Sequence, residues 1–302
     1  MSSYLHKINI FMISILALAI LSFSCTKSSP GTINSIDPEI EKYWFGGEAE
    51  ITSFKLSQAR YGEMREGNAV MIFVTEPFSK KSMTKADRPG SDDPSVLKLN
   101  FTKNFATGIY PYSMMNSSFF PVESGNHSLK ISSSSQEWCG HTYMELQNKN
   151  KFEISCASYF EGENENISLS KDFIEDDVWS MIRLRPSELP TGDIKMIPSF
   201  FYIRLAHKKT TAYNCTASII KNTDGTNNYI LEYPDLDRKL SITYQTAFPH
   251  RIKSWEESYM DGYGANRKKL STTGVAIKTI KSAYWSKNSN KDSYLRTELG
   301  LD

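Results

Sequence analysis

Apolar and polar residues alternate with a period of two over much of the chain, which is the spacing of β-strands with one buried face. Residues 96–101 alternate cleanly, and residues 69–74 form an apolar run that follows a Gly-Asn pair. Asp224-Gly225 is a hairpin turn signal between the strand-like segments 216–220 and 229–233. These segments predict consecutive antiparallel strands joined by turns.

The second half of the chain continues the same pattern. Residues 234–237 turn the chain into the strand-like segment 240–244, and residues 275–280 alternate again. Residues 294–299 are expected to close the sheet. The pattern as a whole predicts a mainly β fold with one large curved antiparallel sheet, either a half-barrel or a barrel-like sheet.

Helix signals are few. Residues 37–44 open with Asp and Pro and carry early acids, which predicts a short helix. Residues 170–183 place Ile174, Val178 and Met181 on one face, so a second helix is expected to cover an opening in the sheet. Residues 80–95 contain a cluster of Pro, Gly, Ser and Asp and predict a mobile loop.

A curved sheet with few helices is similar to the half-barrel of the lipoprotein-carrier folds of the bacterial envelope. This resemblance implies a concave apolar face, on which a lipid or an acyl chain would bind. The alternative is that the same face is filled by ordinary core side chains. The resemblance concerns the fold and carries no activity with it.

The N-terminus has the pattern of an export signal. His6 and Lys7 lead into the uncharged run 8–21, which stops at Ser22-Phe23-Ser24-Cys25. Residues 1–24 therefore resemble a lipoprotein signal peptide that is cut before Cys25, although Ser22 stands where such signals usually have Leu. A transmembrane anchor is the alternative, because the stretch has nearly the ~20 residues that a spanning helix needs. The small residues Ser22 and Ser24 favour cleavage and lipidation of Cys25.

Residues 25–36 begin with a polar stretch that shows no helical or strand spacing of apolar residues. This predicts a flexible tether between the lipid and the folded domain. No acidic run follows Cys25, so the periplasmic face of the outer membrane is the expected location. The membrane is thus an expected partner through acylated Cys25.

Charge and length narrow the class of protein further. The chain has 35 basic and 34 acidic residues, a balance that gives no electrostatic reason to expect nucleic acid as a partner. The part after the signal is long enough to bury a hydrophobic core without disulfides or bound metal ions, and no linker rich in Pro, Gly or Ser divides it. Residues 37–302 are therefore expected to form a single β-rich domain.

One segment carries candidate chemistry. If residues 135–145 form one strand, Glu137, Cys139 and His141 share a face. A histidine beside a cysteine can lower the thiol pKa and make a nucleophile, and a carboxylate can orient the histidine. The alternative is a polar stripe on a sheet. No further ligands stand at a diagnostic metal spacing, so neither a metal nor another cofactor is expected.

The cysteines outside the signal offer another use for the same segment. An exported protein can oxidise pairs among Cys139, Cys156 and Cys215. Residues 148–150 form a turn between the strands that hold Cys139 and Cys156, and the two side chains are expected on opposite faces. A bridge between these two is therefore not expected. Two alternatives stay open: Cys215 forms a disulfide with one of them, or all three cysteines are free thiols.

Three short motifs carry a family resemblance: residues 134–141, residues 189–195 and Tyr61-Gly62-Glu63. Together they resemble a Bacteroidota envelope lipoprotein family, over most of the chain after Cys25, and no residue roles come with the resemblance. Members are sometimes labelled septum formation inhibitor Maf. Genuine Maf proteins are cytoplasmic α/β nucleotide pyrophosphatases with a Ser-x-Ser-Pro-Arg-Arg motif, and this chain has an export signal, a β pattern and no such motif.

The sequence therefore favours a lipid-anchored envelope protein that acts as a binding or structural module, for an apolar ligand such as a lipid or for an envelope protein partner. The first alternative is a thiol-dependent hydrolase or transferase that uses Cys139 and His141, with Glu137 beside them. The second is a scaffold for other envelope proteins. A scaffold predicts an exposed aromatic patch in place of a cavity, and the enzyme predicts a solvent-reachable Cys139 with a depressed pKa.

Overall fold

The computed structural model describes residues 36–123 and 125–302, which belong to one compact unit. The predicted signal peptide (residues 1–24), the predicted lipidation site Cys25 and all of the predicted tether except Ile36 lie outside the described residues. In the described ranges, no helix has both the length and the apolar character that crossing a bilayer requires.

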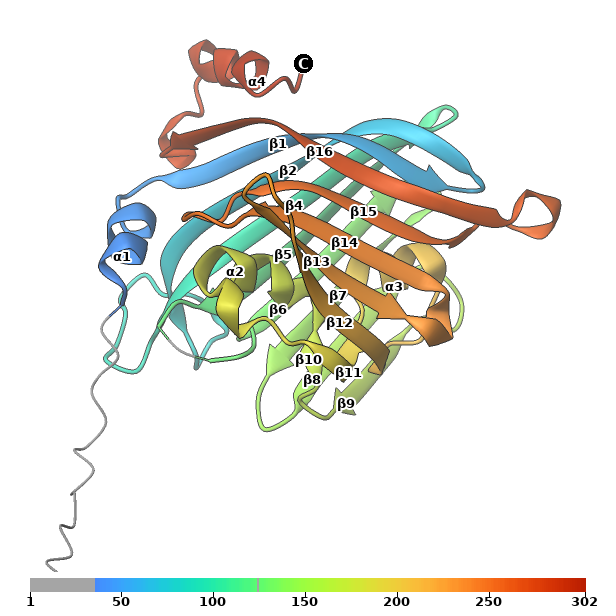
Figure 1. The fold of residues 1–302 in the computed structure, drawn as a ribbon, viewed down its shortest axis with the longest axis horizontal. Coiled ribbons are helices and arrows are strands. Elements are labelled where there is room, and N and C mark those ends of the chain that lie inside the picture. Colours follow the sequence, from blue (N-terminus) through green and yellow to red (C-terminus); the bar gives the residue numbers. More distant parts are fainter. Residues whose placement is uncertain (1–35, 124) are drawn as a thin grey trace, which may run out of the picture. The chain divides into compact units, whose positions relative to one another are not determined.

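The described chain is mainly β, and its sixteen strands form one sheet that does not close (Figure 1). The order is β10-β11-β12-β13-β14-β15-β16-β1-β2-β4-β5-β6-β7-β8-β9, and β3 pairs with β2. All neighbours are antiparallel except β10 and β11. The bounds are β1 Ala49–Arg60, β2 Glu63–Ser79, β3 Thr84–Lys85, β4 Ser95–Thr107, β5 Tyr110–Pro121, β6 Lys130–Glu137, β7 Gly140–Asn148, β8 Phe152–Ser158, β9 Glu165–Leu169, β10 Phe173–Ile174, β11 Gly192–Ile197, β12 Tyr213–Lys221, β13 Thr226–Tyr233, β14 Arg238–Gln245, β15 Ile252–Asp261 and β16 Lys268–Ser282. This confirms the predicted fold class.

Four α-helices and five short 3-10 turns occur in the described ranges. The bounds are α1 Pro38–Trp44, α2 Glu175–Leu184, α3 Phe200–Ala206, α4 Tyr294–Glu298, η1 Pro186–Glu188, η2 Pro234–Leu236, η3 Gly264–Asn266, η4 Tyr284–Ser286 and η5 Asn290–Ser293. The predicted helix α1 is confirmed. Its N-cap Asp37 accepts the Glu39 N–H at 2.8 Å, and Pro38 stands in the first turn, where its missing N–H costs nothing.

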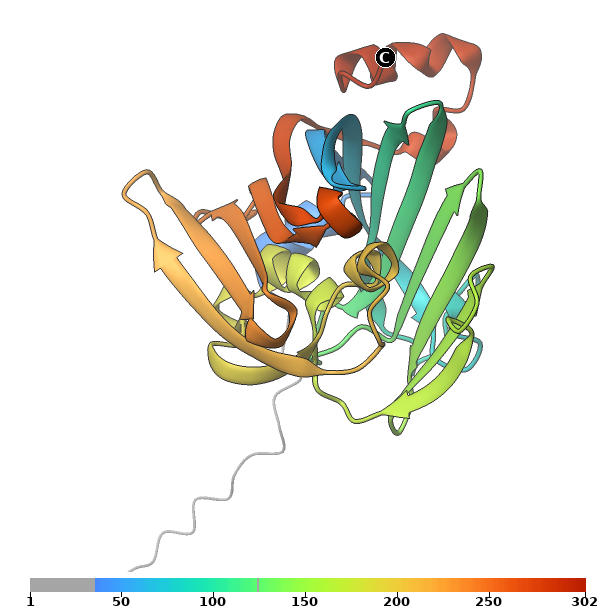
Figure 2. The ribbon, with the colours of Figure 1, turned by 90° about the vertical axis from the view of Figure 1, so that its right-hand side faces the viewer.

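Helices α2 and α3 lie inside the curve of the sheet (Figure 2). α2 begins at Glu175, later than predicted, because residues 173–174 first pair with β11 as strand β10. Every residue of α2 is buried, so this helix is part of the core and does not cap an opening in the sheet. α3 was not expected from the sequence. It is capped by Ser199, whose hydroxyl accepts the Phe201 N–H at 3.3 Å.

The prediction that residues 294–299 close the sheet is wrong, because residues Tyr294–Glu298 form α4. Leu299 instead packs on the outer face of the sheet with Ile51 and Val70, and its carbonyl accepts the Ser53 hydroxyl at 2.5 Å. The segment 80–95 also departs from the expected loop, since it holds the short strand β3.

The main core lies on the concave side of the sheet. Alternate residues of β4, among them Leu99, Phe101 and Lys103, point inward and are buried, as the period of two predicts. The Phe101 ring meets the Trp255 ring at 5.2 Å between centroids. A Cβ on Gly274 would come within 2.1 Å of the Trp255 ring, so this position on β16 needs glycine.

Three consecutive buried carboxylates hold the N-terminus of α2. Glu175 contacts the Arg238 guanidinium through two hydrogen bonds of 2.6 Å. Asp176 accepts the Phe200 N–H at 3.1 Å, and Asp177 accepts a backbone N–H from the β5–β6 connection at 3.0 Å. Burial raises the pKa of Asp176 to about 6. α2 is thereby tied to β14, α3 and the β5–β6 connection.

The C-terminus of α2 is held by a buried ion pair. Arg183 donates to the two carboxylate oxygens of Glu50 at 2.5 and 2.8 Å, and its guanidinium lies 4.8 Å from the Phe73 ring centroid. Glu50 also accepts the Tyr43 hydroxyl. Strand β1, helix α1 and helix α2 therefore meet at one buried carboxylate.

Candidate functional site

The segment predicted as one strand with Glu137, Cys139 and His141 on the same face is a hairpin. β6 ends at Glu137, Trp138 and Cys139 form the turn, and β7 begins at Gly140, which pairs with Glu137. The shared strand face was therefore a wrong prediction. The bend comes from a two-residue turn without the usual Asn-Gly or Asp-Gly signal.

The hairpin brings Glu137 and Cys139 together but not His141. The Glu137 carboxylate accepts the Cys139 N–H at 2.7 Å, and hydrogen bonding to this carboxylate raises the pKa of the exposed thiol. A reactive cysteine needs the opposite shift. Across the described ranges, no hydrogen bond joins the His141 side chain to either residue. In this geometry Glu137 therefore acts on the Cys139 thiol in the direction opposite to activation.

The cysteines after the predicted signal are not bridged in the structure. Cys139 is an exposed free thiol in the β6–β7 turn, Cys156 is a half-buried one on β8, and Cys215 is a buried one on β12. Among the described residues, no three His, Cys, Asp or Glu side chains are placed to hold a metal ion.

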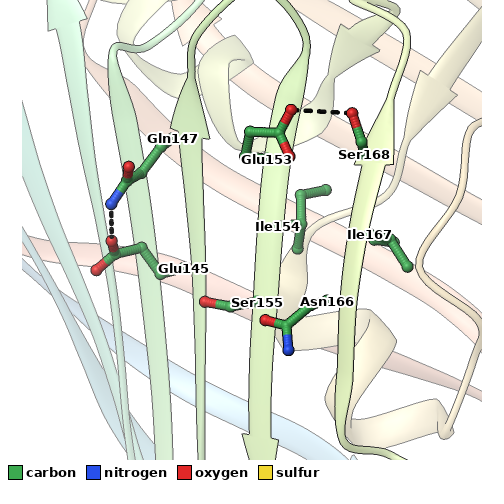
Figure 3. A pocket seen from close by; sticks show the side chains of 8 residues that line it. All are labelled: Glu145, Gln147, Glu153, Ile154, Ser155, Asn166, Ile167 and Ser168. Atoms are coloured by element: carbon green, nitrogen blue, oxygen red, sulfur yellow. Dashed lines mark hydrogen bonds between the residues drawn. The ribbon is translucent and has the colours of Figure 1, made fainter.

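The concave face, where an apolar ligand was one expectation, holds packed side chains of the main core together with α2 and α3. A groove of about 320 Å³ lies over β7, β8 and β9 (Figure 3). Its polar side chains bond to one another: Gln147 donates to Glu145 at 2.6 Å, and Ser168 donates to Glu153 at 2.9 Å. The groove therefore has side chains that satisfy one another, whereas the core around α2 keeps buried polar atoms without a hydrogen-bond partner among the described residues, such as Ser180 Oγ and Trp255 Nε1.

An exposed aromatic surface forms one end of the sheet. The four most exposed large apolar side chains of the described residues are Ile109 (83%), Tyr159 (73%), Trp138 (68%) and Tyr263 (64%). They stand in the turns or connections β4–β5, β8–β9, β6–β7 and β15–β16. In an antiparallel meander every second turn lies at the same end, which brings these turns together. We define the aromatic rim as Tyr61, Ile109, Tyr110, Trp138, Tyr159, Phe160 and Tyr263.

Neighbouring rings of the rim contact one another. Tyr61 lies 6.3 Å from Tyr263, Tyr110 lies 6.2 Å from Trp138, and Tyr159 lies 5.7 Å from Phe160, all between ring centroids. These are the separations of interacting aromatic pairs. The rim is therefore an organised surface and not a set of isolated exposed side chains.

Buried polar contacts hold the rim from below. The Arg60 guanidinium lies 4.2 Å from the Tyr61 ring and donates to the Leu205 carbonyl of α3 at 2.7 Å. The Gly62 N–H donates to the Asp261 carboxylate at 2.6 Å, which joins the β1–β2 turn to the end of β15. The turns are thus fixed relative to one another and to α3.

Some of the charged side chains near the rim are paired. Glu63 pairs with Arg65 at 2.7 Å, Asp237 pairs with Lys269 at 2.5 Å, and Glu163 contacts His207. Within the described ranges, Arg267 and Lys268 beside the Tyr263 turn and Lys208 and Lys209 after α3 form no ion pair. Unpaired basic side chains therefore border the rim.

Sequence reasoning did not find the rim, although two of its turns carry a signal. Tyr61-Gly62 and Gly108-Ile109 set a large side chain beside a glycine with positive φ, a combination typical of tight turns. Such a signal marks one turn at a time. Which turns share an end depends on strand order, which the local pattern does not supply.

Comparison of the chain with protein-family models, with curated proteins and with solved structures gave no match.

Proposed function

We propose that this chain is a lipid-anchored protein of the bacterial cell envelope that binds an envelope protein partner through the aromatic rim. The observation that carries the proposal is the gathering of the four most exposed large apolar side chains at one end of the sheet. Contiguous exposed apolar surface marks interaction sites, and Trp and Tyr supply much of the energy of protein interfaces.

The composition of the rim indicates the chemistry of its partner. Trp, Tyr and Phe are enriched in the cores of protein interfaces. Around the rim, Arg65 and Lys269 are paired with carboxylates, whereas Arg267, Lys268, Lys208 and Lys209 form no ion pair within the described ranges. An aromatic surface with basic side chains at its edge suits a protein partner whose apolar patch is bordered by acidic side chains.

The position of Ile36 supports the same choice. The described chain begins beside α1, at the opposite end of β1 from Tyr61 (Figure 1). The twelve residues of β1 span roughly 40 Å. The chain that comes from Cys25 would therefore enter the described body beside α1, about one strand length from the rim, so its point of attachment leaves the rim free for a partner.

Photo-crosslinking in the producing cell tests the proposal. p-Benzoylphenylalanine is placed at Trp138 or Tyr159 on the rim and, as matched controls, at Ile220 and Ile277, which are 50% and 52% exposed on β12 and β16. We expect one protein adduct of defined mass from the rim positions and none from the controls. Adducts to lipid alone, or the same adducts from all four positions, would contradict the proposal.

The anchor is tested separately. Cys25→Ser should abolish incorporation of labelled palmitate and move the protein from the membrane fraction to the soluble fraction. Incorporation that persists in this variant would contradict lipidation at Cys25.

A further inference from the structure

A pocket of about 280 Å³ opens between α3 with the loop that follows it and strands β7–β9. Its lining includes Arg204, Lys208 and Lys209 on one side and Cys156, Glu163 and Glu165 on the other. This volume corresponds to roughly nine waters, enough for a ligand of about ten non-hydrogen atoms.

Arg204 has hydrogen-bonding capacity that the protein leaves unused. The residue is only 6% exposed, and its buried Nε and Nη1 have no hydrogen-bond partner among residues 36–123 and 125–302. Nη2 makes only a long ion-pair contact of 3.9 Å with Oε1 of Glu137, whose other carboxylate oxygen accepts the Cys139 N–H. The Phe160 ring lies 4.3 Å from the guanidinium carbon and supports it. A buried guanidinium with free donors is costly unless an acceptor reaches it.

Most of the negative charge in the pocket is already engaged. Glu163 contacts His207 through one carboxylate oxygen and accepts the Ser158 hydroxyl at 2.8 Å through the other. Lys208 and Lys209 are exposed, and neither forms an ion pair within the described ranges. Three cationic side chains therefore line the pocket beside a single uncommitted carboxylate, Glu165.

We propose that this pocket binds a small ligand through an oxyanionic group, a carboxylate or a phosphate monoester, with Arg204 as its principal partner and Lys208 and Lys209 at the mouth. A guanidinium offers several N–H donors in a planar fork, which matches the oxygen pairs of both anions. The pocket has its own side chains, so this site does not depend on the partner of the aromatic rim.

Calorimetric titration of the detergent-extracted full chain tests the site. The probes are N-acetylalanine with a free carboxylate, the same compound as its C-terminal amide, and glycerol 1-phosphate. We expect at least one anionic probe to bind at least tenfold more tightly than the amide, and the better of the two identifies a peptide-type or a headgroup-type source. No binding of either anionic probe, or equal binding of the amide, would overturn the proposal.

Variants assign the contact. Arg204→Gln should weaken binding of the anionic probe at least tenfold, whereas Lys221→Gln, an exposed lysine on β12, should leave it unchanged. Because loss of a buried arginine can impair folding, Lys208→Gln combined with Lys209→Gln provides a second test on exposed side chains. This double variant should weaken binding several-fold. Unchanged affinity in both the Arg204 variant and the double lysine variant would contradict the assignment.

Discussion

The ion pair between Glu50 and Arg183 offers a quantitative test of how α2 is held in the core. The side chains of Glu50 and Arg183 are 0% and 2% exposed, and two hydrogen bonds of 2.5 and 2.8 Å join them. Glu50→Gln removes the charge but keeps the shape, leaving the guanidinium buried without a counter-ion. Breaking a buried pair in this way typically costs about 3–5 kcal/mol. Because the Gln carbonyl still accepts one N–H, we expect a loss near 3 kcal/mol in the free energy of unfolding.

Urea denaturation followed by tryptophan fluorescence at pH 7 measures this loss. Arg183→Met and the double variant Glu50→Gln/Arg183→Met complete a double-mutant cycle. The double variant leaves no unpaired buried charge, so its loss in the free energy of unfolding should be clearly smaller than the sum of the losses of the two single variants. A Glu50→Gln variant within 1 kcal/mol of the wild type would refute the reasoning.

The same pair sets a pH dependence. Burial acts to raise the pKa of Glu50, but Arg183 and the hydrogen bonds to the carboxylate outweigh it, so the pKa lies below its usual value. The stability that Glu50 contributes to the folded state is therefore present above the pKa of about 4.3 that a Glu has in the unfolded chain. It is lost as the pH falls through the lower pKa of Glu50 in the folded protein. In Glu50→Gln the free energy of unfolding should not show this decrease at acid pH.

Three further predictions concern other parts of the molecule. Burial raises the pKa of Asp176 to about 6, so the stability that this group contributes is present below the unfolded pKa of about 3.9 and is lost as the pH rises through 6. Asp176→Asn should therefore gain about 2 kcal/mol in the free energy of unfolding relative to wild type between pH 4 and pH 7.5, measured by urea titration. Parallel stability curves of the two proteins would count against this. Gly274→Ala should lower the melting temperature by several degrees, because the added Cβ would overlap the Trp255 ring. Gly46→Ala is the control, because a Cβ there would lie 3.7 Å from the nearest atom, and it should leave the melting temperature unchanged. Equal melting temperatures of the two variants would contradict the close contact between Gly274 and Trp255. Cys139 should react with a disulfide reagent no faster at pH 7 than an ordinary exposed thiol, as its raised pKa requires, and a faster reaction would revive the thiol-enzyme hypothesis.

The parts of the fold that followed from sequence are those fixed by local pattern. The alternation in residues 96–101 predicted a strand that the structure contains as part of β4, and Asp224-Gly225 lies in the turn of the β12–β13 hairpin as predicted. Short apolar runs were harder, because a run such as residues 200–206 suits a buried helix as well as a strand. Burial inside the sheet decides in favour of helix α3, and that information is tertiary.

The candidate sites depended on longer-range information still. The Trp138-Cys139 turn lacks Gly, Pro or Asn, so the local pattern extended one strand through it and placed Cys139 and His141 together. The aromatic rim and the pocket at Arg204 both unite side chains from separate turns and strands. Only the strand order and the packing of α3 against the sheet bring them together.

Binding of the crosslinked partner by rim variants tests the central proposal most directly. Trp138→Ala combined with Tyr159→Ala removes two exposed aromatic side chains, and truncating an interface hot spot costs about 2 kcal/mol, or roughly thirtyfold in affinity. Ile277→Ala is the matched control on the outer face of β16. A partner held by the rim should bind the double variant at least thirtyfold more weakly and the control as tightly as the wild type, with melting temperatures unchanged. Equal affinity for the wild type and the double variant would contradict the proposed role of the rim.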